Sequence, residues 1–173
     1  MNYSKSETPL ARVFGAPLVL LGAAILAGSP AAAASADAPV EQVLFVCEHG
    51  NVKSVMAAAY FNQLAAERNL RLRAVSRGAA ANPASVPPTI VEALQTEGID
   101  VSQVQPLALS PRDAFQSRHV VSIGAELPRT LQEKSVEQWR DVPAASTHYA
   151  AARDSLRAHV SDLLDRLSGP VSQ

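Results

Sequence analysis

The chain has 173 residues, with 15 basic and 16 acidic side chains and a formal net charge of −1 at neutral pH. This near balance, with no basic run and no aromatic side chains interleaved with basic ones, argues against a nucleic-acid partner. The single cysteine cannot form a disulfide within the chain, so its thiol is either buried and inert or kept for chemistry.

The N-terminal residues differ in composition from the rest of the chain. Two basic residues precede an apolar run over residues 13–28, and small residues then lead to an A-x-A site at Ala34-Ser35-Ala36. This order is typical of a secretory signal peptide, and the run is short for a membrane span. We therefore expect residues 1–36 to be a signal peptide, with an uncleaved N-terminal anchor as the alternative.

Removal of the leader would leave residues 37–173, which carry 13 basic and 15 acidic side chains. That length suits one domain. We expect it to be periplasmic or secreted in a bacterium, with no stable membrane span after cleavage.

The strongest local pattern begins with four apolar β-formers at residues 43–46, which predict a short buried strand. A polar turn with Gly50 and Asn51 follows, and an Ala- and Leu-rich helix continues to about residue 66. Strand, loop and helix N-terminus together favour an anion, because backbone N–H groups converge there and the helix dipole is positive. Cys47 occupies the first loop position, so we expect a nucleophilic thiolate and a phosphate-like oxyanion in one cradle.

A simpler interpretation of Cys47 is a small core residue at a strand end, as many free cysteines are. The spacing to Lys53 and Ser54 favours the chemical role, because the intervening loop would close a ring about the size of a phosphate. The loop residues that would line this ring are Glu48, His49, Gly50, Asn51 and Val52.

The remaining sequence alternates between strand and helix patterns. The last helix carries one apolar face, and Trp139 is expected in the core. Gly98 is expected to cap the second helix. Strands are predicted at residues 70–76, 119–123 and 136–139, helices at 86–97, 111–116 and 147–167, and a helical turn within 124–133.

Strands that alternate with helices predict a parallel sheet covered on both faces. The expected fold class is therefore α/β, a three-layer sandwich with a central four-stranded parallel sheet. Ligands of such sheets bind beyond the carboxyl ends of the strands, where Cys47 is placed.

The loop resembles that of the low-molecular-weight protein tyrosine phosphatases and the arsenate reductases that share their fold. Their signature is a strand ending in Cys, five residues, Arg, Ser and a helix. The segment from Cys47 to Ser54 is similar, with Lys53 in place of the Arg. The resemblance covers roughly residues 42–167. Further similar segments are Ser76-Arg77-Gly78, residues 98–102, residues 120–123 and residues 139–143, the last resembling the family's Asp-Pro loop.

The resemblance implies a phosphatase in which the Cys47 thiolate attacks a phosphoryl group and forms a cysteinyl phosphate. Lys53 and the loop amides would hold the phosphoryl oxygens, and Ser54 would donate a hydrogen bond to the thiolate. The implied general acid is Asp141, which Val142 separates from the following Pro. An ordinary loop residue is the alternative for Asp141. The resemblance implies no cofactor.

Four neighbouring residues have open roles. His49, if protonated, could stabilise the thiolate or could be merely solvated. Glu48 would either point outward or pair with Lys53. Arg77 could supply the guanidinium fork that the loop lacks or could be a surface residue, and Ser76 could hold the loop. No metal is expected, since His119, His148 and His159 lack metal-ligand spacing.

Three functions remain open. The first is a phosphatase acting on aryl or tyrosyl phosphates. The second is an arsenate reductase, which would need a small external thiol because the relay through two further cysteines is impossible in this chain. The third is an oxyanion-binding module without turnover, favoured by Lys53 and the displaced Asp141.

Overall fold

The computed structural model of the chain describes residues 39–80, 84–131 and 135–169. These residues belong to one of the two units into which the chain divides, Ala36–Gln173. The expected signal peptide lies outside the described residues. Within the described segments, no helix combines the length and the apolar character needed to cross a membrane.

Strands and helices alternate along the described segments in the order expected from the sequence. The elements are β1 (Glu41–Cys47), α1 (Lys53–Glu67), β2 (Leu72–Gly78), α2 (Pro88–Thr96), α3 (Pro111–Gln116), β3 (Ser117–Ile123), the 3-10 turn η1 (Arg129–Leu131), β4 (Val136–Trp139) and α4 (Tyr149–Ser168).

The strand β2 begins two residues later than expected, at Leu72. The residues between α1 and β2 instead end the helix. Asn69 takes a positive φ of 54°, and the Leu70 N–H donates to the Ala65 carbonyl at 2.8 Å. The Asn69 N–H donates to the Ala66 carbonyl at 3.0 Å. This pair of bonds is a Schellman motif, which satisfies the free carbonyls of the helix end before the strand starts.

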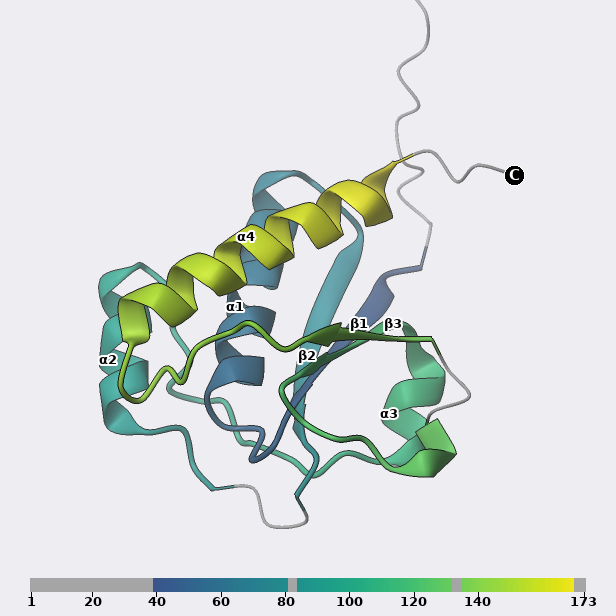
Figure 1. Cartoon of the computed structure of the whole chain (residues 1–173). Coiled ribbons are helices and arrows are strands. Elements are labelled where there is room, and N and C mark those ends of the chain that lie inside the picture. Colours follow the sequence, from purple (N-terminus) through teal and green to yellow (C-terminus); the bar gives the residue numbers. More distant parts are fainter. Residues whose placement is uncertain (1–38, 81–83, 132–134, 170–173) are drawn as a thin grey trace, which may run out of the picture. The chain divides into compact units, whose positions relative to one another are not determined.

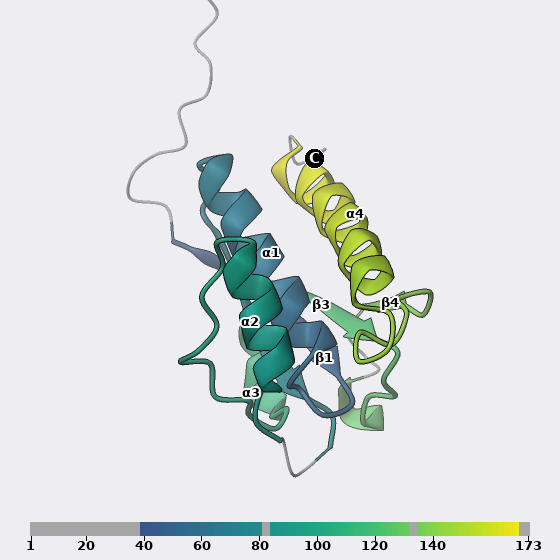
Figure 2. The same ribbon diagram turned by 90° about the vertical axis from the view of Figure 1, so that its left-hand side faces the viewer.

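The four strands form one parallel sheet in the order β2-β1-β3-β4, so β1 is central. Side chains of β1 alternate between two apolar clusters. Val43, Phe45 and Cys47 pack with α1, α2 and α4, whereas Leu44 and Val46 pack on the other face with α3. Figures 1 and 2 show α1 and α4 together over the first face. The structure confirms the α/β three-layer prediction.

The α4 helix covers the sheet with the apolar face expected from the sequence, and Trp139 is 2 % exposed beneath it. At its first turn, the Tyr149 hydroxyl donates to Glu97 at 2.8 Å, and the Tyr60 hydroxyl donates to the same carboxylate at 3.2 Å. Burial, together with these phenol and carboxylate neighbours, raises the pKa of Tyr60. This cluster ties α1, the end of α2 and α4 together. The fully buried residues of the α4 face are Ala152, Leu156, Val160, Leu163 and Leu164.

The edge strand β4 is held by one carboxylate. Glu137 accepts hydrogen bonds from the indole of Trp139 at 2.8 Å and from Arg166 of α4 at 2.7 Å, and it contacts His119 of β3 at 2.8 Å. Burial alone would raise the pKa of Glu137, but these bonds outweigh it and the pKa lies below its ordinary value. The anchored strand fixes the start of the segment that runs from residue 140 to α4.

Candidate active site

The loop after β1 is shaped by a close approach to the end of β2. Gly50 has φ +68°, and a Cβ built on it would lie 2.4 Å from the Gly78 nitrogen. A Cβ on Gly78 would lie 2.9 Å from the carbonyl carbon of His49. The two backbones touch because neither residue has a side chain, and Gly50 adopts a conformation that only glycine takes at no steric cost.

Backbone hydrogen bonds fasten the same side of the loop. The N–H groups of Ala79 and Ala80 donate to the carbonyls of Cys47 and Glu48 at 2.9 and 2.8 Å. On the other side, the Asn51 side-chain amide donates to the Ser85 carbonyl at 3.1 Å. These hydrogen bonds to neighbouring segments therefore hold the loop in one shape.

Cys47 ends β1 next to the first turn of α1. Its sulfur lies 3.1 Å from the hydroxyl oxygen of Ser54, which is completely buried. The α1 helix begins at Lys53 without a side-chain cap and without an acidic residue in its first turn. The first N–H groups of a helix have no partner within it, so this N-terminus favours an anion. A thiolate at Cys47 would meet a hydrogen-bond donor and the positive end of the helix.

A pocket of about 220 Å³ opens at this point. It is smaller than the roughly 300–1,000 Å³ of pockets that enclose a drug-sized ligand, so it fits one chemical group rather than a large molecule. Cys47 is thus part of the apolar core and also one of the residues that line the pocket. The lining residues are Cys47, Glu48, His49, Asn51, Val52, Lys53, Ala144, Ala145 and Ser146.

The structure places the expected loop residues around this pocket, with one exception. Gly50 does not line the pocket, because it packs against Gly78. The wall formed by Ala144, Ala145 and Ser146 was not expected. These small side chains follow β4 by several residues and carry no chemical signal in the sequence, so only the fold reveals their place.

The charged residues of the pocket stand apart from one another. Glu48 and His49 are exposed, and among the described residues neither Glu48 nor Lys53 forms an ion pair. The pairing of Glu48 with Lys53 is absent from the described residues, and Glu48 is an exposed residue of the pocket lining. The Lys53 ammonium reaches the loop after β3, where a Cβ on Gly124 would lie 3.1 Å from its Nζ. Lys53 thus lines the pocket and has no ion-pair partner in the part of the chain that the structure describes.

Asp141 does not line the pocket in this structure. Its two carboxylate oxygens each lie 2.9 Å from Nε2 of His159 on α4. The His159 ring stacks on Trp139, with ring centroids 4.7 Å apart and an interplanar angle of 15°. The hydrogen bond from His159 lowers the pKa of Asp141. The role of general acid stays a prediction, and it requires Asp141 to leave His159.

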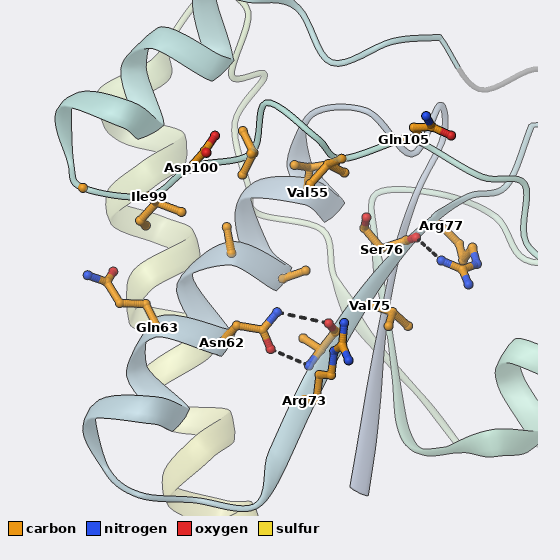
Figure 3. Close-up of a pocket in the computed structure, with 16 residues that line it drawn as sticks. Val55, Asn62, Gln63, Arg73, Val75, Ser76, Arg77, Ile99, Asp100 and Gln105 are labelled. Carbon is orange, nitrogen blue, oxygen red and sulfur yellow. Dashed lines mark hydrogen bonds between the residues drawn. The ribbon is translucent and has the colours of Figure 1, made fainter. Parts of the chain in front are cut away.

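Arg77 does not supply a guanidinium fork to the pocket. It pairs with Asp113 at the start of α3 at 2.8 Å and donates to the Ser76 carbonyl at 2.8 Å (Figure 3). Burial raises the pKa of Asp113, but the bonds from Arg77 and from Ser110 outweigh it, so the carboxyl is held below its ordinary pKa. The expectation of a fork over the oxyanion is corrected: Arg77 instead joins the end of β2 to α3.

Ser76 and Arg77 belong to a second, larger pocket of about 500 Å³ between α1, β2 and residues 98–105 (Figure 3). Two of its polar side chains are engaged by the fold. Asn62 exchanges hydrogen bonds with the backbone of Ala74 at 2.7 and 3.1 Å, and Asp100 accepts from the Ser102 N–H at 2.8 Å. Although it is larger, this pocket is not lined by the thiol of the chain, so the Cys47 pocket is the candidate active site.

A metal site is not evident in the described segments, where no group of three or more His, Cys, Asp or Glu side chains is arranged to hold an ion. The reactive groups that the fold brings together are a thiol, a hydroxyl, an ammonium and a helix N-terminus.

Comparison with solved structures supports the fold. A low molecular weight protein tyrosine phosphatase from T. tengcongensis has a TM-score of 0.62 at 21% identity, over 73% of this chain and 99% of that chain. An arsenate reductase in the phosphate binding state has a TM-score of 0.61 at 22% identity, over 73% and 98%. An arginine phosphatase from Geobacillus stearothermophilus has a TM-score of 0.60 at 21% identity, over 74% and 93%.

A search of curated protein sequences finds no match. The sequence model of one family, described as Low molecular weight phosphotyrosine protein phosphatase, matches residues 42–167. This range runs from β1 through α4 and includes the Cys47 loop, the end of β2 and Asp141. The chain therefore belongs to the low molecular weight phosphotyrosine protein phosphatase family.

Proposed function

We propose that this chain is a phosphatase that hydrolyses aryl or tyrosyl phosphate monoesters through a cysteinyl-phosphate intermediate. The observation that carries the proposal is that Cys47 lines a pocket and that its sulfur lies 3.1 Å from the buried Ser54 hydroxyl at the N-terminus of α1. With residues 1–36 proposed as a secretory leader, the substrate would be met in the periplasm or outside the cell.

The first step is attack of the Cys47 thiolate on phosphorus. The S–P bond forms as the P–O bond to the leaving group breaks, and the leaving oxygen takes a proton from a carboxylic acid, for which Asp141 is the candidate. Lys53 and the amides at the start of α1 offset the charge on the phosphoryl oxygens. Because Lys is a point charge and not a planar fork, it holds these oxygens less specifically than Arg would.

The second step is hydrolysis of the S–P bond by water, which releases inorganic phosphate and returns the thiolate. Ser54 supports both steps by donating a hydrogen bond to the sulfur when it is charged. A hydrogen bond to a charged group contributes about 1.5–3 kcal/mol, or roughly 10- to 150-fold in rate if it acts only in the transition state.

The test is hydrolysis of para-nitrophenyl phosphate by the purified full chain. We expect turnover that is lost in Cys47→Ser and raised in Lys53→Arg, because the guanidinium supplies the missing fork. Thermal unfolding checks that each variant is folded. Turnover that survives Cys47→Ser would rule the proposal out.

A second candidate is an oxyanion-binding module without turnover. The observation that favours it is the position of Asp141, which His159 holds outside the pocket. In addition, Lys53 stands where the loop of the family has Arg. Calorimetry with phosphate, vanadate and arsenate separates the two: micromolar binding without hydrolysis supports the module. Oxidation of added glutathione that depends on arsenate and on Cys47 would instead support reduction of arsenate with an external thiol.

A further inference from the structure

The Cys47 pocket carries two opposite charges that the described part of the protein leaves uncompensated. Lys53 and Glu48 line the same pocket of about 220 Å³, and neither forms an ion pair with a described residue. Lys53 opens α1 and reaches toward Gly124, whereas Glu48 is exposed at the pocket rim. The Lys53 ammonium therefore lies beside Gly124, whereas the carboxylate lies on the solvent-exposed side of the pocket, at its mouth.

A carboxylate at the mouth opposes a substrate that is only anionic. The phosphoryl group of an incoming ester and the Glu48 side chain have the same sign of charge, and like charges at short range repel. The same carboxylate becomes attractive when the substrate carries a cation a few ångströms beyond its phosphoryl group. Glu48 thus discriminates between substrates by the charge of the leaving group.

The other residues that line the pocket offer no second carboxylate for recognition of a cation. Ala144, Ala145 and Ser146 have small side chains without a formal charge. The one ring among the lining residues is the exposed imidazole of His49, directly after Glu48. Glu48 is the only carboxylate in this lining, so a cation on the leaving group finds its attractive partner there.

From this arrangement we propose that the preferred substrates are zwitterionic phosphates, in which a positively charged group lies close to the phosphoryl group and meets Glu48. This inference rests on the proposed phosphatase function and adds the substrate class. Glu48 is the residue that determines specificity, Lys53 binds the phosphoryl end, and the small residues 144–146 leave space for the cationic group between them.

The test compares two aryl phosphates of nearly the same shape, ortho-aminomethylphenyl phosphate, whose ammonium lies close to the phosphoryl group, and ortho-ethylphenyl phosphate, which carries no cation. The quantity measured is the ratio of their kcat/KM values for the full chain and for Glu48→Gln. Comparing this ratio between variants cancels the intrinsic reactivity of the two esters. The matched control is Glu92→Gln on α2, which removes the same charge from an exposed site outside the pocket.

We expect the cationic-to-neutral ratio to fall about fivefold in Glu48→Gln, the effect of roughly 1 kcal/mol from one partly exposed charge pair. The ratio should stay unchanged in Glu92→Gln. Added salt should lower the ratio in the wild type, because it screens exposed charges. The kcat/KM for the neutral ester should rise in Glu48→Gln, since the repulsive carboxylate is gone.

An unchanged ratio in Glu48→Gln, or an equal loss for both esters, would overturn the substrate class while leaving the phosphatase proposal intact. The same fall in Glu92→Gln would also overturn it, because the effect would then come from net charge. Absence of Cys47-dependent turnover with either ester would overturn the phosphatase proposal and this inference with it.

Discussion

Single residues determine the shape of the loop between β1 and α1. Gly50 combines a positive φ with direct contact to the Gly78 backbone. Gly98, after α2, also has a positive φ of 79°, but a Cβ there would meet no atom within 4 Å. A side chain at Gly98 would therefore introduce only backbone strain, whereas a side chain at Gly50 would introduce both backbone strain and a steric clash.

We predict that Gly98→Ala lowers the free energy of unfolding by about 1–2 kcal/mol, the cost of a left-handed conformation for a residue with a side chain. Gly50→Ala should cost more and should also abolish phosphate binding, because the loop must move away from Gly78. Denaturant unfolding and calorimetry with phosphate measure the two effects. Equal unfolding free energies and unchanged phosphate affinity in Gly50→Ala would contradict this account of the loop.

At the scale of elements, α4 controls the position of the candidate general acid. His159 is fixed by its stack on Trp139, which is buried under the helix, and it binds both oxygens of Asp141. This bond depresses the pKa of Asp141. The carboxylate form is therefore favoured in the folded state. The contribution of this bond to stability is present above the unfolded pKa of about 3.9 and is lost as the pH falls through the lower folded pKa.

The variant His159→Phe keeps a ring over Trp139 but removes the hydrogen bond to Asp141. We predict that the pKa of Asp141 then rises toward its ordinary value of about 3.9, as measured by carboxyl-carbon NMR. His148→Phe is the matched control, since His148 contacts Thr147 and not Asp141. If Asp141 is the general acid, the alkaline limb of the pH–kcat profile moves upward with this pKa. An Asp141 pKa that stays depressed in His159→Phe would show that another group is responsible.

At the scale of the whole molecule, the sequence predicted the elements and the Cys47 loop because both have local causes. The apolar run before Cys47, the helix that follows and the apolar face of α4 lie within continuous segments, and hydrophobic periodicity indicates each of them. The 3.1 Å contact between Cys47 and Ser54 joins residues only seven positions apart, so the short loop and the first turn of the helix determine it.

The partners of Arg77 and Asp141 could not be predicted in the same way. Arg77 pairs with Asp113, 36 positions later, and Asp141 pairs with His159, 18 positions later. Each of these pairs depends on how separate elements pack, and no short pattern encodes it. Residues 144–146 are a further example, because their small side chains line the pocket only as a result of lying beside the Cys47 loop in the fold.

The central claim is that Cys47 and a phosphate-like anion share one cradle, and the rate of Cys47 alkylation by iodoacetamide tests it most directly. Cys47 is the only cysteine, so the mass of the intact protein reports modification at this site alone. We predict that phosphate slows the alkylation in a saturable manner and that Lys53→Met weakens this protection. An alkylation rate that is the same at every phosphate concentration would contradict the account.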